Sequence, residues 1–215
     1  MSKTIVLDID GCLANFNLAY GDLFVKVSGE DRFYPGWRVD LQSDNSNFPT
    51  VWAWEDAAGY PKAIVNEVWQ NHILQEGSKF WQTLEPLPGA RETLSMLNHR
   101  QKKFGDQVWF VSTRMGHRAH IQTLEWLYNH GMDYPCLFFA ADKVPYLRQL
   151  GANFFVDDRP ETVWEMARVA GEEKWKDFQL FIKDAPYNRA GRGAGANIVG
   201  SVKEALQMAG LWKGI

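Results

Sequence analysis

Two aspartates one residue apart follow an apolar run near the start of the chain. The stretch IVLDIDG places Asp8 and Asp10 directly after residues 5–7 and before Gly11. An unpaired carboxylate is costly to bury, so it normally takes a proton, a cationic partner or a metal ion. The two acids therefore predict a positive charge supplied from elsewhere in the chain or by a bound ion.

Three later apolar runs also end in residues that could do chemistry. These residues are Ser112, Thr113 and Arg114 after the second run, Lys143 shortly after the third, and Asp157 and Asp158 after the fourth. Ligands of open α/β sheets bind outside the carboxyl ends of the strands. If the apolar runs are parallel strands, all of these side chains meet at one edge of one sheet.

Four carboxylates gathered at one place repel one another and require a cation. Oxygen ligands without histidine suit a hard ion such as Mg²⁺. A lysine and a hydroxyl beside that ion suit a phosphoryl group, which is strongly anionic during transfer. A free carboxylate can attack phosphorus to form an aspartyl-phosphate, and a second acid two residues on can protonate the leaving alkoxide. The residue types therefore favour phosphoryl transfer to a carboxylate.

Short apolar runs alternate with helical patterns along most of the chain. We expect buried strands at 4–7, 107–111, 136–140, 153–156 and 179–182, and helices at 88–100, 117–131, 159–171 and 201–210. The runs are nearly continuous in apolar residues, which is typical of strands covered on both faces. The alternation predicts an α/β fold with a doubly wound, mostly parallel sheet.

The region 14–85 interrupts this alternation. It is rich in aromatic residues, Asn, Asp and Gly, with clear helical period only at 61–74 and a weaker pattern at 19–29. Its length is too great for a loop and small for a separate core. We expect residues 1–13 and 86–215 to form a catalytic core, and 14–85 to form a small, mainly helical cap that decides substrate specificity.

The composition limits the partners and the compartment. The 215 residues carry a formal net charge of −3, which argues against holding nucleic acid by bulk electrostatics. The chain has no run of 18 apolar residues and no charged-then-apolar leader, so we expect neither a membrane span nor a signal peptide. The two cysteines, Cys12 and Cys136, fit a reducing compartment. We expect a cytoplasmic protein with a small-molecule partner; its oligomeric state is open, with a homodimer as one alternative.

In chain order, these motifs resemble those of the haloacid dehalogenase-like phosphatases. The matching residues are the Asp8-x-Asp10 pair, Thr113, Lys143, Asp157 and Asp158. The resemblance extends from residue 4 to about residue 160 and implies the Rossmann-like fold of that family. One departure is Cys12, where Thr or Val is usual.

The resemblance implies roles for the four acids. Asp8 would be the nucleophile and a Mg²⁺ ligand, and Asp10 would be the general acid and base whose backbone carbonyl also binds the metal. Asp157 and Asp158 would complete the metal site. Which of the two binds the ion directly is open, and a helix cap without any metal is the alternative for this pair.

The phosphate-binding residues implied by the resemblance follow the second and third strands. They are Thr113, Arg114 and Lys143. Ser112 is an alternative to Thr113, and Arg118 is an alternative source of the positive charge assigned to Lys143.

A narrower resemblance is to the 5'(3')-deoxyribonucleotidases. It rests on the position of the cap and on the stretches VDDRPE and LFIKDAPYNR, the latter at 180–189. Those enzymes stack the nucleobase on aromatic residues of the cap. The candidates for that role here are Phe33, Tyr34, Trp37, Trp52, Trp54 and Trp81. The resemblance therefore implies Mg²⁺-dependent hydrolysis of (deoxy)ribonucleoside monophosphates, with base, sugar and phosphate position open.

Other functions remain alternatives at this point. The stretch VDDRPETVWEM also resembles the phosphatase half of polynucleotide kinases, which would make the protein a 3'-phosphatase of DNA or RNA ends. The acidic charge and the cap argue instead for a small enclosed substrate, and a different phosphorylated metabolite is a further alternative. A phosphoacceptor signalling domain uses similar residues in the opposite order. A binding module would require a decayed site, yet every catalytic position is filled.

Overall fold

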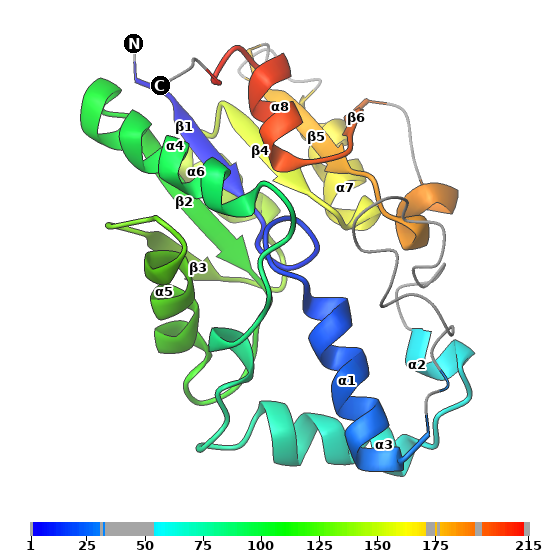
Figure 1. Ribbon diagram of the computed structural model, residues 1–215. Helices are drawn as coiled ribbons and strands as arrows, with labels where there is room; N and C mark the ends of the chain where they lie inside the picture. The colour runs from blue at the N-terminus through cyan, green and yellow to red at the C-terminus, as the bar shows by residue number, and fades with distance from the viewer. Residues whose placement is uncertain are drawn as a thin grey trace.

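A parallel sheet of six strands forms the centre of the protein. The computed structural model describes residues 2–30, 32, 54–170, 175, 177–191 and 195–212. Within these residues every strand pairing is parallel, and the strand order is β3-β2-β1-β4-β5-β6 (Figure 1). The strands are β1 (Thr4–Leu7), β2 (Gln107–Ser112), β3 (Cys136–Phe139), β4 (Phe154–Asp157), β5 (Gln179–Lys183) and β6 (Asn197–Val199). The order reverses between β1 and β4, which makes this the topological switch point where such sheets bind ligands.

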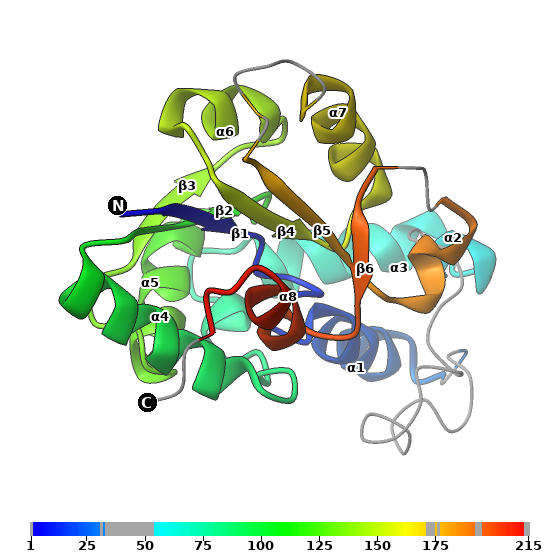
Figure 2. The same ribbon diagram turned by 90° about the horizontal axis from the view of Figure 1, so that it is seen from above.

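Helices cover both faces of the sheet (Figure 2). One face carries α4 (Ala90–Phe104), α5 (Ala119–Asn129) and α8 (Val202–Met208), and the other carries α6 (Val144–Leu150) and α7 (Pro160–Ala170). The central strands are therefore buried on both sides, and Ile5, Val6 and Leu7 are all 0% exposed. This double burial explains why the strand residues are continuously apolar.

The predicted fold class is confirmed, and five strands lie within one or two residues of their predicted bounds. The strand that sequence reasoning missed is β6, which has three residues of which two are exposed. So short and exposed a segment carries no continuous apolar signal. None of the described helices combines the length and apolarity needed to cross a bilayer.

A mainly helical segment leaves the sheet after β1 and returns before α4. Its described elements are α1 (Phe16–Ser28), α2 (Trp54–Ala57), α3 (Lys62–Glu67), the π-helical turn η2 (Val68–Ile73) and the short 3₁₀ turn η3 (Phe80–Gln82). Figure 1 shows α1 running from the end of β1 away from the sheet, with α3 at its far end. The helix predicted at 61–74 is therefore an α-helix that continues as a π-helical turn.

The two chain crossings between this segment and the sheet lie side by side. The Asn15 N–H donates to the Glu85 carbonyl at 2.8 Å, and the Leu87 N–H donates to the Leu13 carbonyl at 2.7 Å. An antiparallel bridge joins Ala14 to Pro86 between them. The helical segment therefore leaves and re-enters the sheet region at one place.

Candidate active site

Lys143 lies between two of the predicted aspartates. Its Nζ is 2.7 Å from Asp8 Oδ1 and 2.8 Å from Asp157 Oδ2. Asp8 follows β1, Asp157 ends β4, and Lys143 directly precedes α6, so the switch point of the sheet brings the three together. The Lys143 side chain is 1% exposed. This ammonium is a protein-derived positive charge of the kind that the sequence predicted for Asp8.

Burial dominates the electrostatics of this cluster. It raises the pKa of Asp8 to about 7, with Lys143 opposing the shift and the charges of Asp157 and Asp10 adding to it. Burial also opposes the charged form of Lys143, but the charges of Asp157 and Asp8 outweigh it and raise the pKa of this lysine. The ammonium therefore stays charged, and it faces more than one carboxylate.

Asp158 is, with Asp157, one of two acids of the cluster that are completely buried. It is 0% exposed, its Oδ2 accepts a hydrogen bond from the Tyr187 hydroxyl, and its backbone carbonyl accepts one from Asn188 Nδ2 at 2.8 Å. A Cβ at Gly11, which has φ +73°, would lie 1.9 Å from Asp158 Oδ2. The loop after β1 thus approaches Asp158 so closely that position 11 has no space for a side chain.

Sequence reasoning did not identify Tyr187 and Asn188 as parts of the site. Both belong to η5 (Pro186–Gly191), which follows β5. They lie in the stretch 180–189 that carried the narrower resemblance, so this stretch was the available signal. Nothing in the sequence linked either side chain to Asp158, about thirty positions earlier.

The residues of the cluster fit a hard divalent cation. Asp158 Oδ1 is buried without a hydrogen-bond partner, which is unfavourable unless an ion or water binds it. Among the described residues, Asp8, Cys12 and Asp158 offer ligand atoms within 4.8 Å of one another. Burial and the charges of Asp158 and Asp8 raise the pKa of the Cys12 thiol, so it is a neutral and weak ligand. The carboxylates of Asp8 and Asp158 therefore remain as the oxygen ligands that Mg²⁺ prefers.

Asp157 has less capacity for a metal ion than Asp158. Its Oδ2 accepts from Lys143, and its Oδ1 accepts from the backbone N–H of Arg159 at 2.9 Å, directly before α7. Asp157 therefore combines an ion pair with a capping contact.

Arg114 pairs with Asp10. Its Nη2 is 2.7 Å from Asp10 Oδ1 and its Nε is 2.9 Å from Asp10 Oδ2, which is a bidentate contact. The same guanidinium donates to Thr123 Oγ1 at 3.1 Å and lies 5.0 Å from the ring centroid of Trp81. Ser112 Oγ lies 3.4 Å from the Asp10 carboxylate. The sequence led us to expect Arg114 on the phosphate, whereas in the structure its guanidinium binds Asp10.

A cavity of about 480 Å³ opens in front of these groups. Its wall on the sheet side includes Asp8, Asp10, Thr113 and Arg114. Thr113, the predicted phosphate-binding residue, is half-buried there. The alternative cation, Arg118, is exposed at the start of α5 and does not line this cavity. The predicted site residues of the first two strands thus face one common space.

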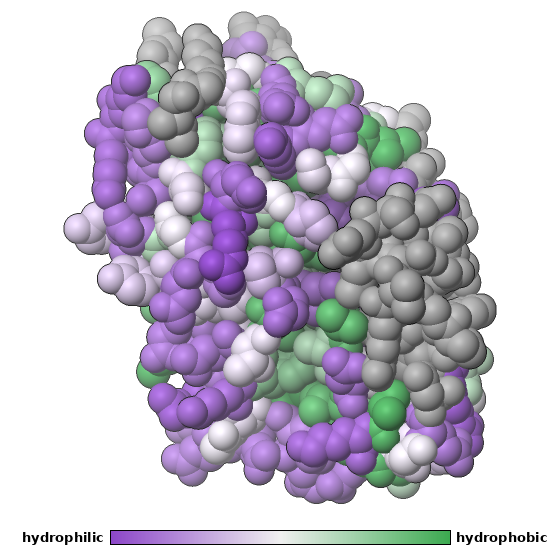
Figure 3. Space-filling view, viewed as in Figure 1, coloured by the Kyte–Doolittle hydropathy of each residue, from purple (hydrophilic) through white to green (hydrophobic). Residues whose placement is uncertain are grey.

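The opposite wall of the cavity comes from the helical segment. It includes Phe16, Tyr20, Glu55, Trp69 and Trp81. Figure 3 shows apolar surface, in green, gathered in the lower middle of this face over α1 and framed by polar surface. Trp81 was one of the predicted aromatics, whereas the other four were not assigned to a pocket from the sequence. Phe33, Tyr34, Trp37 and Trp52 lie outside the described residues, as does the side chain of Trp54.

The aromatic residues of this wall contact one another. The Phe16 ring stacks on Tyr20 at a centroid distance of 5.0 Å and on Trp81 at 5.8 Å. Trp69 Nε1 donates to the Tyr20 hydroxyl at 2.7 Å, and that hydroxyl donates to Glu55 Oε1 at 3.4 Å. The wall therefore combines flat apolar rings with one carboxylate.

Several solved structures have the same fold as this chain. A dehalogenase crystal structure matches with a TM-score of 0.52 and 16% identity over 96% of both chains. A Bacillus subtilis protein solved with bound magnesium, and provisionally assigned as a HAD-hydrolase, gives 0.53 and 13% over 97% of this chain and 99% of its own. A HAD family hydrolase from Deinococcus radiodurans R1, with bound phosphate and sodium, gives 0.51 and 14% over 100% and 99%. The fold is that of the haloacid dehalogenase-like hydrolases.

The family within that class follows from the sequence as a whole. The family model described as "5' nucleotidase, deoxy (Pyrimidine), cytosolic type C protein" matches residues 2–193, and the chain belongs to this family. The description of this family is that of nucleotidases, which hydrolyse phosphoric monoesters. A protein from Chlorobaculum tepidum, named provisionally as a 5'(3')-deoxyribonucleotidase, is 30% identical over 93 residues. That alignment spans 41% of this chain and 42% of the relative. The resemblance stated from the motifs is confirmed.

Proposed function

We propose that this protein is a Mg²⁺-dependent phosphomonoesterase that hydrolyses (deoxy)ribonucleoside monophosphates through an aspartyl-phosphate on Asp8. One observation carries the proposal: a single cavity is lined by Asp8 and Asp10 on one wall and by aromatic side chains on the other. Its volume of about 480 Å³ is within the range of small-molecule sites. Stacking on aromatic rings contributes about 1–3 kcal/mol per base, which favours nucleotides over plain sugar phosphates.

The first half-reaction transfers the phosphoryl group to the protein. An oxygen of the Asp8 carboxylate attacks phosphorus, the bond to the ester oxygen breaks, and protonated Asp10 gives its proton to the leaving alkoxide. Lys143 holds Asp8 Oδ1 in place, and Arg114 holds the Asp10 carboxylate by two hydrogen bonds. Thr113 and Lys143 are the expected ligands of the phosphoryl oxygens.

The second half-reaction restores the enzyme. Asp10, now ionised, takes a proton from water, the water oxygen attacks phosphorus, and the bond between phosphorus and Asp8 breaks. Inorganic phosphate leaves with Asp8 again a carboxylate and Asp10 again protonated. Asp10 therefore serves both steps, which is why its orientation by Arg114 matters for the whole cycle.

Asp8, Asp158 and the backbone carbonyl of Asp10 would hold Mg²⁺. The unpartnered Asp158 Oδ1 favours this residue over Asp157 as the direct ligand. When bound, the ion supplies positive charge that offsets the negative charge of the transferring phosphoryl group. The carboxylates must be ionised to bind it, although burial raises the pKa of both Asp8 and Asp158.

The division of the chain is part of the same proposal. Residues 1–13 and 86–215 would form the catalytic core, and 14–85 would form a cap that selects the substrate. The paired crossings at 13–15 and 85–87 support these boundaries. A small-molecule substrate, a cytoplasmic location and the absence of a stable nucleic-acid partner remain predictions that accompany the proposal.

A phosphate-release screen tests the function. It covers 5'- and 3'-nucleotides, sugar phosphates and 3'-phosphorylated oligonucleotides, each with and without Mg²⁺. We expect nucleoside monophosphates to be hydrolysed best, only with Mg²⁺, and not by the Asp8→Asn variant. Turnover restricted to oligonucleotides would make the protein a 3'-phosphatase of nucleic-acid ends. Undiminished turnover by Asp8→Asn would disprove the nucleophile assignment.

A further inference from the structure

The two oxygens of the Asp158 carboxylate have different surroundings. Oδ2 accepts a hydrogen bond from the Tyr187 hydroxyl, whereas Oδ1 is buried and has no hydrogen-bond partner. The loop at Gly11 also encloses Oδ2, since a Cβ at this position would lie 1.9 Å from Oδ2 and 2.7 Å from the Tyr187 hydroxyl. One oxygen is therefore tethered and enclosed, and the other is left for a ligand.

The backbone on both sides of this tether is fixed by Asn188, which follows Tyr187 and is 0% exposed. Its Nδ2 donates to the Asp158 carbonyl at 2.8 Å and to the Lys183 carbonyl at 2.7 Å. Its Oδ1 accepts from the Ala185 N–H at 3.1 Å. These bonds join the end of β5 to the residue that follows β4. The Tyr187 hydroxyl and the Asp158 carboxylate are therefore held together by more than their own hydrogen bond.

The number of oxygens that a carboxylate offers influences which divalent cation it prefers. Mg²⁺ is small and requires a near-ideal octahedron, in which a carboxylate normally supplies a single oxygen. Ca²⁺ is larger, takes about six to eight oxygens and often binds both oxygens of one carboxylate. Selectivity between the two ions depends on the number and the flexibility of the ligands. A carboxylate with one tethered oxygen is therefore suited to Mg²⁺ and poorly suited to two-oxygen binding of Ca²⁺.

We propose that Tyr187 is a positioning residue that restricts Asp158 to one metal-binding oxygen and thereby favours Mg²⁺ over Ca²⁺. This inference rests on the metal dependence in the proposed function and specifies how the ion is selected. Tyr187 does not line the cavity of about 480 Å³, so contact with a substrate there does not account for its buried hydroxyl. The hydroxyl acts through the carboxylate that it holds.

The test compares the binding of two ions to the metal-free protein. Calorimetric titration gives the Kd of Mg²⁺ and of Ca²⁺, and the ratio of the Ca²⁺ value to the Mg²⁺ value measures selectivity. Tyr187→Phe removes only the hydroxyl. We expect this variant to lower the ratio at least about tenfold, because a hydrogen bond to a metal ligand contributes about 10–100-fold to affinity. Tyr128→Phe, which removes a hydroxyl from an exposed position of α5, should leave the ratio unchanged.

The ratio distinguishes positioning from a general effect on the structure. If Tyr187 only supported the fold, Tyr187→Phe would weaken the binding of both ions equally, and an unchanged ratio would overturn the proposal. A second measurement does not depend on the folding of this variant. The two carboxylate stretching bands in the infrared spectrum lie further apart for one-oxygen than for two-oxygen coordination. The bands of Mg²⁺-loaded protein that disappear in Asp158→Asn should have the wide separation, and a narrow one would overturn the proposal.

The same titrations separate this inference from the function on which it rests. Mg²⁺ binding with the expected change of ratio, but without phosphate release by the unmodified protein, would overturn the proposed function alone. Mg²⁺-dependent phosphate release with an unchanged ratio in Tyr187→Phe would overturn the role of Tyr187 alone. Absence of Mg²⁺ binding by the unmodified protein would overturn both the role of Tyr187 and the metal dependence.

Discussion

The guanidinium of Arg114 holds both oxygens of the Asp10 carboxylate, at 2.7 Å from Nη2 and 2.9 Å from Nε. The two residues follow different strands, and the Arg114 side chain is fully buried while Asp10 retains 15% exposure. A bidentate contact fixes the plane of the carboxylate as well as its position. The proton-transfer group of the proposed mechanism is therefore oriented before any substrate binds.

Arg114→Ala should slow reactions that need protonation of the leaving group. Without the guanidinium, Asp10 loses its orientation, and general acid catalysis contributes about 10²–10⁴-fold. We expect kcat to fall by at least about 10²-fold for a nucleotide and by much less for p-nitrophenyl phosphate, whose leaving group needs no proton. Arg118→Ala, at an exposed position, is the matched control and should retain full activity. An equal loss on both substrates would show that Arg114 acts on the phosphate instead.

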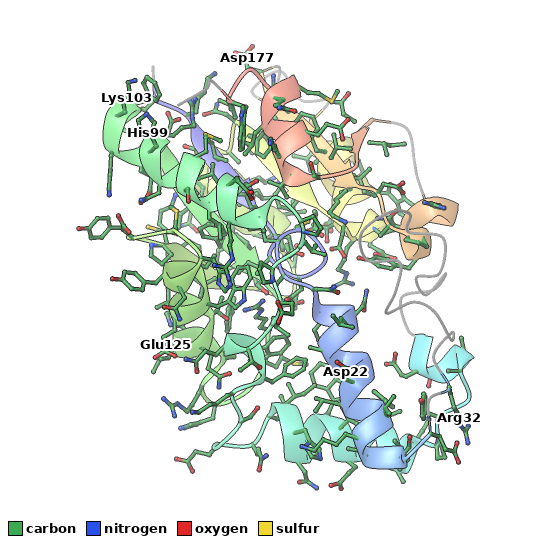
Figure 4. All side chains as sticks on the ribbon, in the orientation of Figure 1. Asp22, Arg32, His99, Lys103, Glu125 and Asp177 are labelled. Carbon is green, nitrogen blue, oxygen red and sulfur yellow. The ribbon has the colours of Figure 1, made fainter. Side chains whose placement is uncertain are left out.

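Lys143→Met should destabilise the protein strongly. The change leaves Asp8 and Asp157 without their shared ammonium, and removing one partner of a buried ion pair costs about 3–5 kcal/mol. The free energy of unfolding from urea titration measures this loss. Lys103→Met on α4, far from the site in Figure 4, should change it by less than about 0.5 kcal/mol. Similar unfolding free energies for the two variants would contradict the buried pairing.

Gly11→Ala should damage the site more than its backbone strain alone explains. The new Cβ would lie 1.9 Å from Asp158 Oδ2 and 2.7 Å from the Tyr187 hydroxyl. Gly105→Ala has nearly the same positive φ, +70°, but no atom within 4 Å of the new Cβ. The control should therefore lose only about 1–2 kcal/mol from the left-handed conformation. We expect a larger drop in thermal midpoint and loss of phosphate release for Gly11→Ala alone; equal effects would argue against the close approach.

Removal of metal by EDTA should abolish phosphate release, and Mg²⁺ should restore it. Because a ligand that binds only the folded state stabilises it, Mg²⁺ should also raise the thermal midpoint of the metal-free protein. Asp158→Asn should lose this stabilisation, since it removes the proposed ligand. Asp177→Asn, at an exposed position at the other end of the molecule in Figure 4, should keep it. A full Mg²⁺ shift in Asp158→Asn would exclude Asp158 as a ligand.

Glu55 should make the stability of the protein depend on pH. Burial raises the pKa of this carboxyl above its ordinary value of 4.5, so the folded state holds the proton more tightly than the unfolded state. The contribution of the Glu55 carboxyl to the free energy of unfolding is most favourable below pH 4.5. It is lost as the pH rises through the raised pKa of the folded state. We therefore expect the thermal midpoint of Glu55→Gln, relative to that of the unmodified protein, to increase from pH 4 to pH 8. A constant difference across this range would show that the carboxylate is not desolvated.

The sheet was predictable because each core strand carries its own signal. Residues 154–156, for example, are fully buried, so all three are apolar. Such a run can be recognised in the sequence without knowledge of its neighbours. The positions of Asp8, Lys143 and Asp157 were predictable for a related reason, since the carboxyl ends of parallel strands share one edge. Their placement followed from topology alone and needed no knowledge of side-chain contacts.

The partners of the site residues were not predictable in the same way. The contact between Arg114 and Asp10 joins positions 104 apart in the sequence, and it depends on a rotamer rather than on a pattern. The wall formed by Tyr20, Glu55 and Trp69 draws on three separate elements whose packing no local periodicity encodes. Sequence patterns therefore located the edge of the sheet where Asp8, Lys143 and Asp157 meet, but not the surface opposite it.

The paired crossings at 13–15 and 85–87 have a mechanical consequence. Two strands of chain joined by hydrogen bonds resist twisting more than two separate tethers, so we expect the helical segment to rock about this pair and not to swivel. Trp81 lies just before the returning crossing, and its ring covers the Arg114 guanidinium. Trp81 also donates from its backbone N–H to Gln122 Oε1 and from Nε1 to the Met115 carbonyl, so it would stay with Arg114 while Phe16 and Tyr20 moved past it. A substrate could then be admitted without disturbing the alignment of the proton donor.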